Sequence, residues 1–433
     1  MRGFGISHLG TGTRSLELYK RALQLMPGGV NSPVRAMQAI GRDPVFVASG
    51  DGAELVDVDG NRYVDWVMSW GPLIAGHAHP DVVRAVAEAA RRGTSYGAPT
   101  EAEVELADQV ARRIPGAEMV RMTSSGTEAT MSAVRLARAA TGRDAVVKFA
   151  GAYHGHVDGL LADAGSGLAT QGIPASPGVT AAQAADTIVV PWNDRAAVEG
   201  ALAARPVAAL LCEPYPANMG LVPPAPGFLE HLRAATRAAG ALLVFDEVIS
   251  GFRVARGGAQ EREGIAPDLT TLGKVLGGGL PAAAYAGPAE LMERVAPAGD
   301  VYQAGTLSGN PLATAAGLAT LALLDAGAYE RLERTTERLA TGLERAAAAA
   351  GVPVTVPWTT GLLTVFFSAE QVRDLDGARA CDMEAHAAFC RALLDRGVYP
   401  PPSQFEAWFV SLAHEEEHVE RTIEAASEAF ASL

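Results

Sequence analysis

The chain has 433 residues, of which 48% are hydrophobic and 19% are charged. That balance supplies enough apolar side chain to offset the conformational entropy lost on folding, and it excludes an intrinsically disordered chain. The formal net charge is −14, from 49 acidic and 35 basic residues, and no run of Lys and Arg occurs, so nucleic acid is not expected as a partner.

The cysteines and the apolar segments indicate where the protein works. Cys212, Cys381 and Cys390 do not have the spacing of a disulfide framework or a zinc site, which favours a reducing compartment. Residues 1–10 contain no apolar segment behind a basic head, so no secretory signal is expected. The longest uncharged apolar stretch, 312–324, is too short to span a bilayer. We expect a cytoplasmic protein without membrane contact.

The N-terminal part predicts one helix and a small antiparallel sheet. Apolar residues recur at helical spacing over 15–26, and Pro27-Gly28-Gly29 ends the helix. Segments 45–47, 53–57 and 62–66 read as strands, and the turn Asp59-Gly60-Asn61 joins the last two.

From about residue 80, helices alternate with short apolar runs, which predicts a parallel sheet covered by helices on both faces. The runs are Met119–Thr123, Ala145–Phe149, Thr187–Val190, Val207–Cys212, 241–245, Leu269–Leu272 and 282–286. Beyond residue 324, helices near 328–350, 381–396 and 415–433 and a strand-like run at 361–367 predict an α+β lobe. We expect an α/β protein in three parts: 1–70 joins a small domain, 71–325 forms the large domain with a mostly parallel sheet, and 326–433 completes the small α+β domain.

Ligands of open parallel sheets sit beyond the carboxyl ends of the strands. Ser125-Gly126-Thr127 follows the run Met119–Thr123 and opens a helix, so its N–H groups and hydroxyls suit a phosphate. Ser125 and Glu128 equally fit a capping box that needs no ligand.

Two further strand ends carry groups with potential chemistry. Asp246 ends a strongly apolar strand, so its carboxylate needs a cation nearby, either Arg253 or a protonated ring nitrogen of a cofactor. Lys274 is one of three lysines and the only one that ends a strand among glycines, which makes it the best nucleophilic amine, although a loop lysine at the surface would look the same.

Several common classes of site have no support. The histidine pairs at 77/79 and 154/156 lack a metal-ligand spacing, so we expect no metal and a packing role for most of these side chains. There is no dinucleotide fingerprint, Walker loop or nucleophile elbow. A phosphate-binding turn, a buried carboxylate and a lysine at one sheet edge together match the protein groups that pyridoxal phosphate requires.

At this point the sequence resembles the class III pyridoxal-phosphate aminotransferases of fold type I. The matching segments run nearly end to end: 27–35, 69–72, 97–100, 125–129, 153–156, 164–167, 245–248, 302–311 and 402–406. The segments with Arg35, with Trp70, with Gly165-Ser166-Gly167 and with Gln404-Phe405-Glu406 look specific to the aminomutase branch of that family.

The resemblance implies roles for the residues around the cofactor, pyridoxal 5'-phosphate (PLP) and its aminated form (PMP). Lys274 would bind the cofactor as an imine and move protons, Asp246 would pair with its ring nitrogen, and Tyr153 would stack on the ring. The phosphate would be held by Ser125, Gly126 and Thr127, joined by Thr306 from the partner subunit of a homodimer.

Other residues would contact the substrate. Ser32, Arg35 and Trp70 would line the pocket, with Arg35 pairing with the substrate carboxylate. Ser166 would belong to a mobile loop, and Glu406 would stand where related ω-aminotransferases place an arginine. Asn218 would also contact the cofactor or substrate, but Pro216 and Ala217 depart from the family pattern in the loop that carries it.

The activity implied is an isomerase that exchanges an amino group within one small substrate for porphyrin (tetrapyrrole) biosynthesis, without an external amino donor. Transient contact with glutamyl-tRNA reductase, which would supply that substrate, is also implied. Two alternatives stay open: an ω-amino acid transaminase or amino-acid racemase of the same family, and a non-catalytic phosphate-ligand binder.

Overall fold

The computed structural model describes residues 12–162 and 176–433. Its largest sheet has seven strands in the order β4-β10-β9-β8-β7-β5-β6. Their bounds are β4 Met119–Thr123, β5 Ala145–Phe149, β6 Thr187–Val190, β7 Val207–Cys212, β8 Leu242–Glu247, β9 Leu269–Leu272 and β10 Ala283–Gly287. The prediction of a mostly parallel sheet is confirmed, with β10 as the exception, because it runs antiparallel to both β4 and β9.

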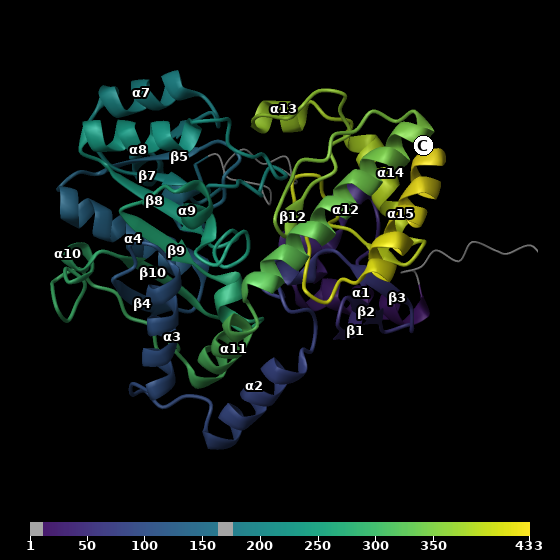
Figure 1. Ribbon diagram of the computed structural model, residues 1–433, viewed down its shortest axis with the longest axis horizontal. Helices are drawn as coiled ribbons and strands as arrows, with labels where there is room; N and C mark the ends of the chain where they lie inside the picture. Colours follow the sequence, from purple (N-terminus) through teal and green to yellow (C-terminus); the bar gives the residue numbers. More distant parts are fainter. Residues whose placement is uncertain (1–11, 163–175) are drawn as a thin grey trace, which may run out of the picture.

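Helices cover the two faces of this sheet, and alternate residues along the strands face each layer. Val146, Leu211 and Val244 pack with α4 (Gly126–Thr141), whereas their neighbours in sequence pack with α7 (Arg195–Ala204) and α8 (Phe228–Ala239). Figure 1 shows α7 and α8 together on one side of the sheet. Burial on both faces explains why these strands read as continuous apolar runs.

The described residues form two smaller sheets besides the large one. The first contains β1 (Val47–Asp51), β2 (Glu54–Asp57), β3 (Arg62–Asp65) and β13 (Val398–Tyr399), in that order. Its first strand spans Val47–Asp51, so the predicted strand 45–47 begins two residues too early and overlaps it only at Val47. The parallel pairing of β13 with β3 joins an N-terminal and a C-terminal segment of the chain.

The second small sheet contains β11 (Trp358–Thr359), β12 (Leu362–Leu363) and β14 (Trp408–Phe409). The predicted continuous strand over 361–367 is wrong, because its pairing stops after Leu363 and returns only as one bridge between Phe366 and Thr355. The division of the chain at residues 70 and 325 stays a prediction.

Helices close to four of the predicted ones are present at Thr13–Leu25, Ala326–Ala350, Met383–Leu394 and Glu416–Ala431. α12 packs along α15 beside the small sheets (Figure 1). No single helix in the described ranges is both long and apolar enough to cross a membrane. The helices Pro311–Ala322 and Ala326–Ala350 meet both conditions only when taken together, and they are bent by 81° at the break between them. The bounds are α1 Thr13–Leu25, α2 Pro80–Arg92, α3 Glu101–Arg113, α6 Ala181–Ala184, α9 Gly258–Glu263, α10 Ala289–Met292, α11 Pro311–Ala322, α12 Ala326–Ala350, α13 Leu375–Arg379, α14 Met383–Leu394 and α15 Glu416–Ala431.

Candidate active site

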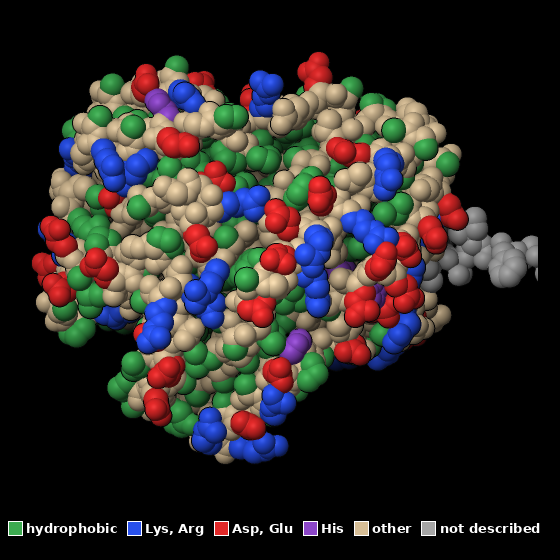
Figure 2. Space-filling model, in the orientation of Figure 1, with side chains coloured by type: hydrophobic (Ala, Val, Ile, Leu, Met, Phe, Trp, Pro, Cys, Tyr) green, Lys and Arg blue, Asp and Glu red, His purple; other side chains and the backbone are tan. Residues whose placement is uncertain are grey.

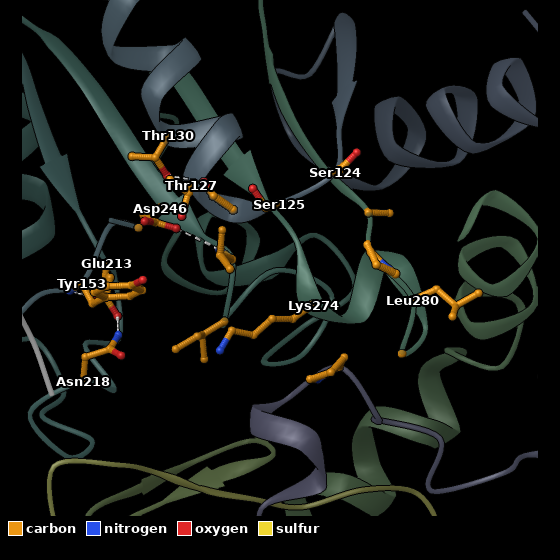
Figure 3. A pocket seen from close by; sticks show the side chains of 18 residues that line it. Ser124, Ser125, Thr127, Thr130, Tyr153, Glu213, Asn218, Asp246, Lys274 and Leu280 are labelled. Atoms are coloured by element: carbon orange, nitrogen blue, oxygen red, sulfur yellow. Dashed lines mark hydrogen bonds between the residues drawn. The ribbon is translucent and has the colours of Figure 1, made fainter. Parts of the chain in front are cut away.

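A cavity of about 300 Å³ opens at the carboxyl edge of the large sheet (Figure 3). It is bounded by the residues that follow β4, β5, β7 and β9 and by the end of β8. Seven of the residues predicted from the sequence line it: Ser125, Gly126, Thr127, Tyr153, Asn218, Asp246 and Lys274. The sheet edge therefore brings together groups that are up to 149 positions apart, from Ser125 to Lys274.

The start of α4 forms one wall of the cavity. Ser125 caps this helix, because its Oγ accepts a hydrogen bond from Glu128 N at 3.2 Å, and Glu128 Oε2 in turn accepts one from Ser124 N at 2.8 Å. The predicted cap is thus present. The remaining first-turn N–H groups of a helix have no partner within it, so together with the Thr127 hydroxyl they form a suitable anion site.

Gly126 allows a close approach between the start of α4 and the loop after β8. A Cβ at this position would lie 3.1 Å from the Val248 side chain, closer than most real contacts. The absence of a side chain lets the helix start approach the loop after β8, which brings the anion site close to Asp246.

Asp246 is buried at the end of β8, and its carboxylate is held by three groups. His154 Nδ1 lies 2.7 Å from Oδ2, while Thr271 Oγ1 and Val248 N donate to Oδ1 at 3.2 and 3.1 Å. The partner is therefore a histidine rather than Arg253, whose guanidinium binds backbone carbonyls instead. The other ring nitrogen of His154 is buried without a hydrogen-bond partner among the described residues.

Glu213, directly after β7, adds a second buried carboxyl to the cavity. Its Oε1 accepts from Tyr153 N at 2.7 Å and its Oε2 from the Asn218 side chain at 2.8 Å, so it holds two predicted site residues together (Figure 3). Burial raises the pKa of Glu213 to about 7, only partly offset by His154 and these hydrogen bonds.

Lys274 stands opposite these carboxyls, just after β9. Its Nζ donates to the Trp70 carbonyl at 2.8 Å and lies 5.8 Å from the centre of the Phe409 ring. Burial lowers the pKa of Lys274, and Arg253 adds to that effect, whereas Glu406, Glu213 and Asp246 oppose it. A lowered pKa keeps more of the amine neutral and nucleophilic.

Tyr153 presents a half-exposed ring to the cavity beside Glu213 and Asn218 (Figure 3). Burial raises the pKa of the Tyr153 hydroxyl, so this side chain acts as a neutral aromatic surface. A flat ring at this place can stack on another ring.

Other predicted residues lie outside the cavity lining. The backbone carbonyl of Trp70 accepts the hydrogen bond from Lys274. The charge of Glu406 raises the pKa values of Lys274 and Tyr153. Thr306 lines a separate cavity of about 400 Å³ with residues 95–100. Ser32 and Arg35 are placed in the N-terminal segment and do not line the cavity that holds Lys274. Ser166 and its neighbours lie outside the described residues.

Two residues of this site are missing from the sequence prediction. Glu213 ends its strand in the same way as Asp246, so the strand-end rule that found Asp246 applies to it equally. His154 is adjacent to Tyr153, but packing was the expected role for most of the histidines, and only the three-dimensional path of the loop shows its contact with Asp246.

These residues fit pyridoxal phosphate. One cavity brings together the four groups that this cofactor needs. They are an anion site at the start of α4, the Asp246 carboxylate at the end of an apolar strand, the aromatic face of Tyr153 and the Lys274 amine with its lowered pKa. Among the described residues, the buried Asp246 pairs with a histidine and with no lysine or arginine, which leaves room for a cationic ring nitrogen.

Comparison with known proteins agrees with this chemistry. Residues 37–430 match the family model described as aminotransferase class-III. The chain is 59% identical to the glutamate-1-semialdehyde 2,1-aminomutase of Roseiflexus castenholzii, over 97% of this chain and 98% of that protein. It is 58% identical to the protein of the same name from Thermomicrobium roseum, over 96% and 97%.

Solved structures of two enzymes resemble this chain over nearly its whole length. An omega-transaminase from Sphaerobacter thermophilus superimposes with a TM-score of 0.90 at 33% identity, covering 98% of this chain and 99% of that one. A glutamate-1-semialdehyde-aminomutase variant from Pseudomonas aeruginosa PAO1 in complex with PMP has a TM-score of 0.87 at 30% identity, covering 99% and 96%. The predicted fold type I α/β architecture is confirmed, and the chain belongs to the class III aminotransferases.

Proposed function

We propose that this protein is a glutamate-1-semialdehyde 2,1-aminomutase, an isomerase that converts (S)-4-amino-5-oxopentanoate to 5-aminolevulinate for tetrapyrrole biosynthesis. The 59% identity to a relative of that name, over 97% of this chain and 98% of that protein, carries this conclusion. The geometry around Lys274 supplies the chemistry that the reaction needs.

Pyridoxal phosphate is the cofactor, and when bound it carries the amino group and withdraws electrons from the substrate carbon. Ser125, Gly126 and Thr127 would bind its phosphate at the start of α4. Asp246, oriented by His154 and Thr271, would face the ring nitrogen and keep it protonated. Tyr153 would cover one face of the ring, and Asn218 would be oriented by Glu213.

Lys274 would supply the amine to which the cofactor aldehyde attaches, and as a free amine it would move protons between neighbouring substrate carbons. Its lowered pKa keeps a fraction of Nζ unprotonated and able to accept a proton, and the Trp70 carbonyl fixes the position of Nζ. One group with access to both carbons can serve the proton transfers at both of them.

The contacts with substrate are also proposals. Ser32, Arg35 and Trp70 would bind the substrate, with Arg35 at its carboxylate, and Ser166 would close over it. The negative charge of Glu406 beside Lys274 disfavours a second carboxylate at that place, which argues against 2-oxoglutarate as a substrate.

We further propose a cytoplasmic homodimer in which Thr306 completes the phosphate site of the partner subunit. Thr306 lies in a cavity separate from Lys274 of its own chain, and the nearby Tyr302 and Leu307 are 71% and 54% exposed. Figure 2 shows hydrophobic side chains among charged ones over the neighbouring helices α2 and α3. A transient contact with glutamyl-tRNA reductase would pass on the reactive aldehyde.

The high TM-score to an omega-transaminase favours one alternative, a conventional transaminase. Incubation of the purified protein with the semialdehyde alone distinguishes the two. An aminomutase forms 5-aminolevulinate without any second substrate, whereas a transaminase turns over only when 2-oxoglutarate or pyruvate is added. A requirement for the added oxo acid would refute the proposal.

A further inference from the structure

Arg253 is a fully buried arginine whose surroundings the reaction does not explain. In the described part of the chain it makes no ion pair, and its guanidinium donates instead to the backbone carbonyls of Gly71, Gly361 and Val410, the last two at 3.3 and 2.9 Å. Its Cζ also lies 5.2 Å from the centre of the Phe409 ring. Burying a charge that only backbone carbonyls satisfy costs folding free energy, which indicates that Arg253 has a role that offsets this cost.

The segment next to Arg253 has an unusual backbone. Met68, Ser69 and Trp70 have φ values of +46°, +57° and +68°, and Gly71 follows at +110°. Three consecutive residues with side chains in the left-handed region persist only where the surroundings hold them. At Gly71 a Cβ would lie 2.8 Å from the Phe409 ring and 3.3 Å from Lys274 Cδ.

The same segment presents the carbonyl that binds the catalytic amine. Lys274 Nζ donates to the Trp70 carbonyl, and Arg253 donates to the carbonyl of the next residue, Gly71. Both cations also lie within 6 Å of the centre of the Phe409 ring, at 5.2 and 5.8 Å. Arg253 therefore ties the strained segment to the small sheet at the point where Lys274 rests.

We propose that Arg253 is a positioning residue: it clamps segment 68–71 through the Gly71 carbonyl and so keeps the Trp70 carbonyl in place as the resting site of the free Lys274 amine. The inference rests on the role proposed for Lys274. The test below needs no turnover, so its failure is distinguishable from failure of the proposed activity.

The decisive variant is Arg253→Lys, which keeps a positive charge but cannot span three carbonyls with one ammonium group. The full-length, cofactor-free chain is labelled briefly with acetic anhydride over a range of pH, and the modified lysines are quantified by mass spectrometry. Lys20, exposed on α1, serves as the internal reference. Backbone hydrogen–deuterium exchange is followed in a peptide covering 66–73.

We expect faster exchange in this peptide and a labelling midpoint of Lys274 at lower pH than in the wild-type chain. A carbonyl acceptor favours the ammonium form, so its displacement leaves the amine neutral at lower pH. The other charged groups that act on Lys274, namely Glu406, Glu213 and Asp246, are unchanged in this variant.

Arg253→Met serves as the second variant, since an apolar side chain of similar length is better tolerated in a buried site. Backbone exchange over 66–73 should again be faster. The labelling midpoint of Lys274 should lie at higher pH than in Arg253→Lys, because the loss of the nearby positive charge favours the ammonium form. The difference between the two variants separates the clamp from the charge.

Arg143 provides the matched control, because its guanidinium also binds three backbone carbonyls, those of Val207, Ala239 and Gly240 at 3.0, 2.9 and 2.7 Å, away from the cavity. Arg143→Met should leave both readouts at their wild-type values. The proposal is overturned if Arg253→Lys leaves the Lys274 midpoint unchanged, if exchange over 66–73 does not accelerate in either Arg253 variant, or if Arg143→Met causes the same changes.

Discussion

His154 and Asp246 form a buried pair at the base of the cavity, with 2.7 Å between Nδ1 and Oδ2. The pair fixes the carboxylate that is proposed to face the cofactor ring, and Thr271 and the Val248 amide bind only the other oxygen. Loss of the imidazole therefore leaves Oδ2 of Asp246 without a hydrogen-bond partner among the described residues.

The variant His154→Leu should lower the free energy of unfolding by about 1–3 kcal/mol, the typical cost of a buried acceptor left unsatisfied. Because Asp246 also becomes mobile, cofactor affinity should fall roughly tenfold or more. Chemical denaturation and titration of the visible cofactor absorbance measure the two effects. His386→Leu, at another buried histidine on α14, is the control that should lose stability but keep cofactor affinity.

Glu213 should make stability depend on pH. Its pKa is about 7 in the folded chain against 4.5 for an unperturbed glutamate, so between these values the folded state binds more protons than the unfolded state. The free energy of unfolding should then fall as pH rises from about 5 to 7, by at most about 3 kcal/mol from this group.

Glu213→Gln removes that contribution, so the difference in stability between wild type and variant should shrink or reverse as pH rises. Urea denaturation at several pH values measures it. Glu247, whose pKa burial also raises, is present in both chains and cancels from the difference. A difference that does not vary with pH would show that Glu213 is ionised throughout.

Most strands of the large sheet could be predicted because a strand that is buried on both faces appears in the sequence as a continuous apolar run. Strands such as β5 and β7 are covered on both faces, so their boundaries coincide with the apolar runs. Strand direction is not encoded in this way: the apolar run of β10 reads like the others, yet it lies antiparallel. Short strands such as β12 depend on partners distant in sequence, which no local pattern specifies.

The sequence likewise predicted some parts of the site and not others. Ser125, Asp246 and Lys274 were found because each follows a recognisable strand, and the sheet edge brings them together. The contact of His154 with Asp246 spans 92 positions, and that of Arg253 with Gly71 spans 182, so both depend on the tertiary path of loops. The sequence left Arg253 or a cofactor ring nitrogen as the partner of Asp246, and the structure shows that Arg253 is not the partner and that His154 contacts the carboxylate.

Ser125 has two separable roles, capping α4 and binding phosphate. Ser125→Ala should cost about 1 kcal/mol of folding stability through loss of the cap. It should also weaken cofactor binding, because the hydroxyl faces the anion site. Asp194→Ala removes the cap of α7, where Asp194 accepts from Ala197 N at 2.9 Å, and should cost similar stability without changing cofactor affinity. Equal losses of affinity in both variants would argue that Ser125 acts only through helix stability.

Lys274 is the residue on which the proposed chemistry depends, and the scarcity of lysine makes the assignment easy to check. Lys274→Ala should lower turnover by about 10⁴-fold or more, because it removes both the attachment point and the group that moves protons. Borohydride treatment of the cofactor-loaded wild type should fix the cofactor to the peptide containing Lys274, and no peptide of the variant should carry it. Lys20→Ala, on the surface of α1, should retain turnover and labelling at Lys274. Cofactor fixed to Lys148 instead would contradict the geometry, because that amine is buried within β5 and donates to the Leu160 carbonyl at 3.0 Å rather than facing the cavity.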